Sequence, residues 1–122
     1  MPVSGVDHVL LAAPPGCERE ARSFYGSLLG LEEIAKPADM RSAGGVWFAA
    51  GAQELHVGVA DDFAPARKAH PGLRVTGEGE LERLAGALFE AGADVRWDDR
   101  VAGVRRFFTD DPWGNRVELL DR

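Results

Sequence analysis

The chain has 122 residues, of which 45% are hydrophobic and 28% are charged. This length suits one domain with its own core, and the composition excludes an intrinsically disordered chain. The 20 acidic and 14 basic residues give a net charge of −6, which disfavours a nucleic-acid-binding protein because such proteins are normally basic.

The chain carries a single cysteine and no long apolar segment. One cysteine can form neither an internal disulfide nor a cysteine-based zinc site, and it suits a reducing compartment. Residues 1–16 have no basic stretch, so we expect no signal peptide. No apolar run approaches the ~20 residues of a membrane helix. We therefore expect a cytoplasmic protein with neither a membrane nor a nucleic acid as partner.

The first half of the chain predicts one helix among short strands. Ala21, Phe24, Tyr25 and Leu28 follow the i, i+3, i+4, i+7 spacing of one helix face, and Gly30 can end that helix. In chain order we expect a strand at 6–13, a helix at 17–29, a strand at 31–35, a loop at 36–45 and a hairpin of strands at 46–50 and 53–59.

The second half repeats this order. Leu81, Leu84, Ala85 and Leu88 have the same helical spacing, and Gly92 again ends the helix. We expect a strand at 70–75, a helix at 80–91, a strand at 93–97, a polar loop at 98–104 and a hairpin of strands at 105–110 and 115–120. The segment 111–115, Asp-Pro-Trp-Gly-Asn, has the residues of a tight turn.

Each half therefore predicts a β-α-β-β-β module. From His8 to His70 and from Gly30 to Gly92 the separation is 62 residues, which indicates an internal duplication. We predict an α+β fold of two tandem βαβββ modules whose mixed sheets form a cup. The whole chain, 1–122, is predicted to be a single domain, with module one at about 5–60, a linker at about 61–69 and module two at about 70–121.

All three histidines fall on strand faces that carry polar residues. Side chains two residues apart share a face of a strand. His8, His56 and His70 lie on such faces, and adding 62 to position 56 gives Glu118. Imidazole and carboxylate groups are ligands of divalent metal ions such as Zn, Ni, Mn or Fe. The sequence thus predicts a metal site formed by His8, His56, His70 and Glu118.

Other polar residues of these strands are candidates for catalysis or substrate binding. Glu54 shares a strand face with His56 and is its rival as the fourth ligand. Whichever of the two is not a ligand could serve as a general base, so Glu54 is also the candidate catalytic residue. Arg74, Arg116 and one of Arg105 or Arg106 could bind a carboxylate or phosphate of a substrate.

Four stretches of sequence resemble the vicinal oxygen chelate superfamily, the glyoxalase, bleomycin resistance and extradiol dioxygenase group. They are DHVLLAAPPGCEREARSFYGSLLGLEE at the start, QELHVGV with AHPGLRV in the middle, and FFTDDPWGNRVELL at the end. The resemblance covers nearly the whole chain. It implies two βαβββ modules, a homodimer, and metal ligands matching His8, His70, Glu118 and either His56 or Glu54.

The resemblance also implies a range of functions. The first is a metal-dependent lyase or isomerase that binds two adjacent oxygens of a small oxygenated metabolite. The alternative is a metal-free protein that binds a drug or metabolite, as bleomycin resistance proteins do. A dioxygenase is less expected, because many ring-cleaving members carry four modules. The Glu-Leu-His stretch at 54–56 departs from the glyoxalases, which commonly carry Glu at the fourth ligand position.

Overall fold

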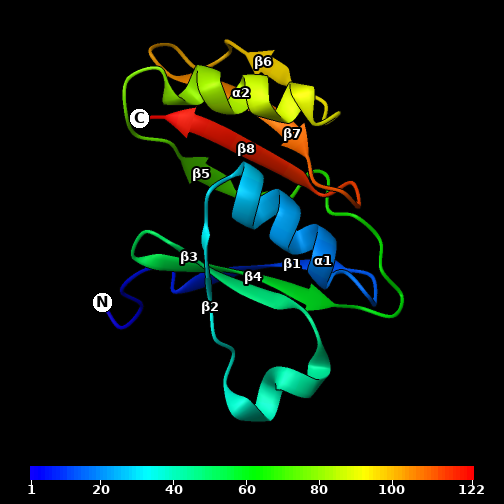
Figure 1. Ribbon diagram of the computed structural model, residues 1–122. Coiled ribbons are helices and arrows are strands. Elements are labelled where there is room, and N and C mark those ends of the chain that lie inside the picture. The colour runs from blue at the N-terminus through cyan, green and yellow to red at the C-terminus, as the bar shows by residue number, and fades with distance from the viewer. The chain divides into compact units, whose positions relative to one another are not determined.

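The computed structural model describes residues 1–122, which divide into two compact units, Met1–Ala64 and Pro65–Arg122. Each unit has the order β-α-β-β-β and contains one four-stranded mixed sheet (Figure 1). The predicted α+β fold of two tandem βαβββ modules is therefore confirmed. No helix is both long and apolar enough to cross a membrane.

The sheet of the first unit has the strand order β1-β4-β3-β2. Strand β1 pairs with β4 in parallel, and the other neighbours are antiparallel. The elements of this unit are β1 (His8–Ala13), α1 (Glu18–Ala21), the π-helix η1 (Arg22–Leu28), β2 (Glu32–Ile34), the 3-10 helix η2 (Ala38–Ala43), β3 (Val46–Ala50) and β4 (Gln53–Val59).

The sheet of the second unit has the matching order β5-β8-β7-β6, with β5 and β8 parallel. Its elements are β5 (Gly72–Arg74), α2 (Glu80–Glu90), β6 (Arg96–Asp98), β7 (Arg105–Asp110) and β8 (Arg116–Asp121). The predicted turn at 111–115 joins β7 to β8. Asp111 and Asn115 of this turn are buried, and Asp111 accepts hydrogen bonds from the main chain of Trp113 and Asn115.

Both units bury one face of their sheet beneath a helix. In the first unit the aromatic ring of Phe48 on β3 lies 6.0 Å from that of Tyr25 on η1, and both residues are fully buried. In the second unit Leu84 and Leu88 of α2 are buried, as is Phe107 on β7. The opposite faces carry the polar side chains, as the alternation of each strand requires.

The helix of the first unit differs from the regular helix that the spacing predicted. It begins as α1 and continues as η1, where Leu29 donates its N–H to the Phe24 carbonyl at 3.0 Å, an i→i+5 bond. Such wider turns are rare, and hydrophobic spacing does not distinguish them from α-helical turns. The predicted loop at 36–45 also contains a short 3-10 helix, η2.

Position 45, just before β3, requires glycine for steric reasons. Its φ is +88°, and a Cβ placed there would lie 2.2 Å from the Val57 carbonyl oxygen on β4. Any other residue would clash and would also adopt an unfavourable backbone conformation. The main-chain N–H of Gly45 donates a 2.6 Å hydrogen bond to Oε2 of Glu18 in α1, so this residue ties the helix to the sheet.

Candidate metal centre

In the first unit, the pairing of β1 with β4 brings three candidate residues to one face of the sheet. His8 lies opposite Glu54, and Leu10 lies opposite His56. The His8 ring stacks on the His56 ring, with centroids 4.4 Å apart. His56 is buried, whereas the His8 side chain remains 46% exposed.

Trp47 on β3 completes a stack of three rings. Its ring lies parallel to that of His56, with centroids 3.7 Å apart and an interplanar angle of 3°. The tight β3–β4 hairpin produces this contact because it places Trp47 directly opposite His56. Trp47 was not among the predicted site residues. The predicted hairpin of strands 46–50 and 53–59 nevertheless places it opposite His56, and this pairing could have identified it.

Glu54 and His56 interact directly. His56 Nε2 lies 2.9 Å from Glu54 Oε1, and the Glu54 side chain is 40% exposed. The strand registers show which of the two corresponds to Glu118 in the second unit. Leu10 pairs with His56, and Gly72 pairs with Glu118. Both partners are shifted by 62 residues, so His56 is the structural counterpart of Glu118.

In the second unit, His70 and Glu118 are in contact. His70 lies two residues before β5 and within the predicted strand 70–75, which is shorter in the structure. Its Nε2 lies 2.9 Å from Oε1 of Glu118, which is buried on β8. Its Nδ1 lies 2.9 Å from the carbonyl oxygen of Lys68. Because a carbonyl can only accept, Nδ1 carries the proton.

Arg106 binds the second oxygen of Glu118. It donates a 3.2 Å hydrogen bond to Oε2, and it also donates from Nε and Nη2 to Oδ1 of Asp98 on β6, at 3.2 and 3.0 Å. From the sequence, Arg106 is expected only as one of two possible substrate-binding arginines. Its contact with Asp98 depends on the pairing of β6 with β7. The residue pattern of one strand does not reveal which strand lies beside it.

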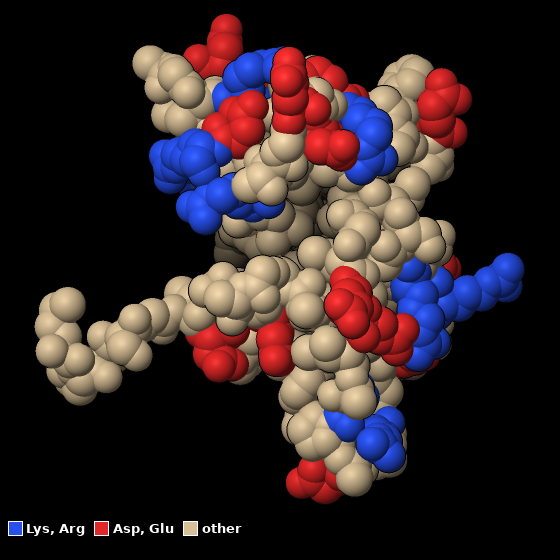
Figure 2. Space-filling model, turned by 60° about the vertical axis from the view of Figure 1, so that its left-hand side comes forward, with Lys and Arg blue, Asp and Glu red and all other residues tan.

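This network shifts the pKa values of its members. The Arg100 main-chain N–H and the Arg106 guanidinium lower the pKa of Asp98. Hydrogen bonds to Asp98 and Glu118 raise the pKa of Arg106. Both groups are therefore charged near neutral pH. On the face of the molecule drawn in Figure 2, acidic and basic side chains lie interspersed.

The two other candidate arginines differ in their surroundings. Arg74, at the end of β5, is exposed and donates from Nε to the carbonyl of Arg122 at 2.6 Å. Arg116, at the start of β8, has a buried Nε with no hydrogen-bond partner. Its guanidinium carbon lies 5.8 Å from the centroid of the Phe108 ring, a weak cation–π contact.

Neither unit by itself gathers three His, Cys, Asp or Glu side chains in an arrangement that could hold a metal ion. The first unit brings His8 to His56, and the second brings His70 to Glu118. Binding of one ion by all four residues stays a prediction.

Comparison with known proteins gives matches among solved structures. No protein-family model matches the chain, and no curated protein matches it. A glyoxalase family protein from Bacillus anthracis is 43% identical, with a TM-score of 0.91 over 98% of this chain and 96% of that one. A lactoylglutathione lyase from Agrobacterium tumefaciens is 20% identical, with a TM-score of 0.76 over 99% and 96%. A fosfomycin resistance protein from Listeria monocytogenes is 17% identical, with a TM-score of 0.76 over 98% and 94%. The last two share the fold alone.

Proposed function

Because the chain belongs to the glyoxalase family, we propose that it is a metal-dependent enzyme of the lyase or isomerase type. Its substrate is a small oxygenated metabolite that offers two adjacent oxygens. The proposed ligands of a Zn, Ni, Mn or Fe ion are His8, His56, His70 and Glu118. These imidazole and carboxylate donors suit a divalent ion of this kind.

One observation carries the metal proposal: the tautomers of two repeat-related histidines. His8 Nδ1 lies 2.8 Å from the Asp7 carboxylate, and His70 Nδ1 lies 2.9 Å from the Lys68 carbonyl. An N–H held in this way leaves Nε2 of the neutral ring with a free lone pair, which is the usual arrangement of a metal-binding histidine. In the second unit Nε2 of His70 lies 2.9 Å from a carboxylate oxygen of Glu118. Two acceptors at this distance require a proton or a cation between them.

The chain's own residues supply proton transfer and substrate binding. A bound divalent ion would supply Lewis-acid stabilisation of negative charge developing on the substrate oxygens. Glu54 is assigned the role of general base, because the strand registers make His56, and not Glu54, the counterpart of Glu118, and the half-exposed Glu54 carboxylate can turn toward a substrate. Arg74 and Arg116 have guanidinium groups with N–H donors to spare for an anionic group of the substrate.

Metal titration of the purified chain tests this function. Untagged protein stripped with a chelator is titrated with Zn²⁺, Ni²⁺, Mn²⁺ and Fe²⁺, and bound metal is measured by elemental analysis and calorimetry. We expect about one equivalent of at least one ion, and about 100-fold weaker binding for His8→Ala and Glu118→Ala, since a lost ligand costs at least as much as a lost outer-shell partner.

Glu90→Gln is the matched control, because Glu90 is an exposed carboxylate at the end of α2. It should bind metal like the unchanged protein. If none of the four ions binds near one equivalent, the metal-dependent function is wrong, and the metal-free ligand-binding function that the family resemblance also implies takes its place.

A further inference from the structure

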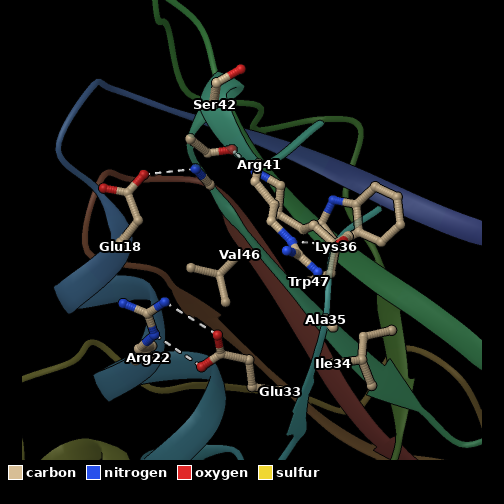
Figure 3. Close-up of a pocket in the computed structure, with 12 residues that line it drawn as sticks. Glu18, Arg22, Glu33, Ile34, Ala35, Lys36, Arg41, Ser42, Val46 and Trp47 are labelled. Atoms are coloured by element: carbon tan, nitrogen blue, oxygen red, sulfur yellow. Dashed lines mark hydrogen bonds and ion pairs between the residues drawn. The ribbon is translucent and has the colours of Figure 1, made fainter. Parts of the chain in front are cut away.

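A cleft of about 440 Å³ opens in the first unit, beside the edge strand β2 and the 3-10 helix η2 (Figure 3). This volume lies within the range of about 300–1,000 Å³ that is usual for small-molecule sites. The cleft lies wholly within Met1–Ala64, and none of the proposed metal ligands lines it. Charged and apolar residues both line the cleft, and together they indicate which kind of ligand it can bind.

Arg22, the first basic residue of the lining, already has a carboxylate partner. It donates from Nε and Nη2 to the two oxygens of Glu33, at 2.9 and 3.2 Å. Figure 3 shows this forked pair on the helix side of the cleft. A two-bond contact of this kind satisfies both charges, so neither Arg22 nor Glu33 is available to attract a ligand.

The other carboxylate of the lining, Glu18, is also engaged. Its Oε2 accepts the 2.6 Å hydrogen bond from Gly45 N–H, which holds it on the side of the cleft next to α1. The two acidic residues of the lining thus each serve a structural contact.

Lys36 and Arg41, by contrast, have no carboxylate partner. The Lys36 ammonium group donates to the Gly44 carbonyl, and Arg41 Nε donates to the Lys36 carbonyl at 3.3 Å. An ammonium group has three N–H donors and a guanidinium group has five, so both side chains keep most of their donors. The contacts to carbonyls also limit the motion of both side chains, which lowers the entropy that a ligand would have to overcome.

An aromatic and an aliphatic surface lie next to these two cations. Figure 3 shows the Trp47 indole beside Arg41 and Lys36, and Ile34 lies further along the chain beyond Ala35. Basic groups beside an apolar wall suit a molecule that carries an anionic head on an apolar or aromatic body. The chain as a whole carries a net charge of −6. The electrostatic attraction for such an anion therefore comes from Lys36 and Arg41 and not from the overall charge.

We propose that this cleft is a binding site for small organic anions. Lys36 and Arg41 bind the carboxylate or phosphate head, and Ile34 and Trp47 contact the body. The lining contains none of the proposed metal ligands, although the Trp47 ring stacks on that of His56.

Titration of metal-free protein with matched probes tests the site. Benzoate and phenyl phosphate represent the two possible heads, benzyl alcohol is the neutral analogue, and inorganic phosphate represents a head without a body. Binding is followed by NMR through the Trp47 indole N–H and the Gly44 and Gly45 amides. We expect benzoate or phenyl phosphate to shift these signals saturably, with at least about 10-fold weaker binding of benzyl alcohol, since a hydrogen bond to a charged group is worth about that much.

Variants assign the binding to the two cations. Lys36→Gln and Arg41→Gln should each weaken binding of the preferred probe about 10-fold. Arg19→Gln, which removes an exposed cation of α1 outside the cleft, should leave it unchanged. Circular dichroism and the remaining amide signals confirm that each variant is folded, and Lys36→Arg should restore binding because it restores the charge.

Three outcomes would overturn the proposal. These are no saturable shift with either anionic probe, equal binding of benzyl alcohol, and unchanged binding by the folded Lys36→Gln and Arg41→Gln variants. Tighter binding of phenyl phosphate than of benzoate identifies phosphate esters as the ligand class, and the reverse identifies carboxylic acids. The protein is stripped of metal throughout, so failure of the metal-centre proposal leaves this result intact.

Discussion

Glu118 has a separate partner for each of its carboxylate oxygens. His70 Nε2 faces Oε1, Arg106 donates to Oε2, and Asp98 holds Arg106 through two further hydrogen bonds. In the proposed metal centre a carboxylate held in this way would present Oε1 to the ion, while the Arg106 guanidinium neutralises Oε2. Partners behind a ligand orient it and typically change metal affinity by about 10–100-fold. Arg106 is therefore a positioning residue for the proposed metal centre.

Replacing Arg106 tests this role. We expect Arg106→Gln to weaken metal binding by about 10-fold or more, because Glu118 loses the donor that holds Oε2. Arg106→Lys should recover part of the affinity because it keeps a charged donor. Calorimetric titration of chelator-treated protein measures both.

Arg105→Gln serves as the control for this pair of variants. Arg105 is the neighbouring residue on β7, but it is exposed, and its guanidinium lies over Trp97 instead of reaching Glu118. Equal metal affinities for Arg105→Gln and Arg106→Gln would show that Arg106 does not position the ligand.

At the scale of elements, the first helix is tied to the sheet by a charged contact. The Glu18 carboxylate at the start of α1 accepts the Gly45 N–H at the start of β3. Hydrogen bonds from Gly45 N–H and from its own main-chain N–H lower the pKa of Glu18 below the ordinary value of 4.5. A carboxyl group with a lowered pKa in the folded chain stabilises it at pH values above 4.5. This stabilisation is lost as the pH falls through the lowered value.

The Glu18→Gln variant should therefore have a pH-dependent deficit in stability. At pH 7 we expect its free energy of unfolding to be about 1 kcal/mol below that of the unchanged protein, the usual size of one such hydrogen bond. Below the folded-state pKa of Glu18 the difference should shrink, because both side chains are then neutral. Urea unfolding at neutral and acidic pH measures the difference.

Glu20→Gln is the control on the same helix turn, since Glu20 is exposed and makes no such contact with β3. At pH 7 it should lower the free energy of unfolding by less than Glu18→Gln does. If the loss of stability in Glu18→Gln is the same at neutral and acidic pH, the ionised Glu18 carboxylate does not stabilise the fold through its hydrogen bond with Gly45.

At the scale of the whole molecule, the expected homodimer stays a prediction that one feature supports. Strand β1 lies at the edge of its sheet, and an edge strand can pair with a strand of another chain. The side chain of Leu10 on this strand is exposed, with 57% of the residue surface accessible, and Val6 just before the strand is 64% exposed. An edge strand with exposed apolar residues is a common site of chain association.

Light scattering during size-exclusion chromatography tests the association. We expect the unchanged protein to have twice the mass of one chain, and Leu10→Lys to shift it toward the mass of a single chain by placing a charge on β1. Phe89→Lys is the control, because Phe89 is an exposed apolar residue of α2. A single-chain mass for the unchanged protein at all concentrations would refute the homodimer.

Much of the fold could be predicted because it depends on local patterns. The strands at 46–50, 53–59 and 105–110 have the predicted bounds, since alternation and tight turns define them. The family resemblance is confirmed as well. The π-helical turns of η1 could not be predicted, because the apolar spacing is the same as in an α-helix.

The candidate site was predictable only in part, since side-chain partners depend on neighbouring strands. The 62-residue offset correctly pairs His56 with Glu118 in the observed registers. It does not reveal that Glu54 contacts His56 or that Arg106 connects Glu118 to Asp98. The first contact depends on side-chain rotamers, and the second depends on the pairing of β6 with β7, which brings Asp98 beside Arg106.

The stack of three rings in the first unit has a consequence for spectroscopy. Trp47 is a fluorophore whose ring lies 3.7 Å from that of His56, close enough for a positive charge acquired by the imidazole to alter the excited indole. A proton or a metal ion bound at His56 supplies such a charge. The protein thus contains its own optical reporter, which can follow events at His56 without an added label.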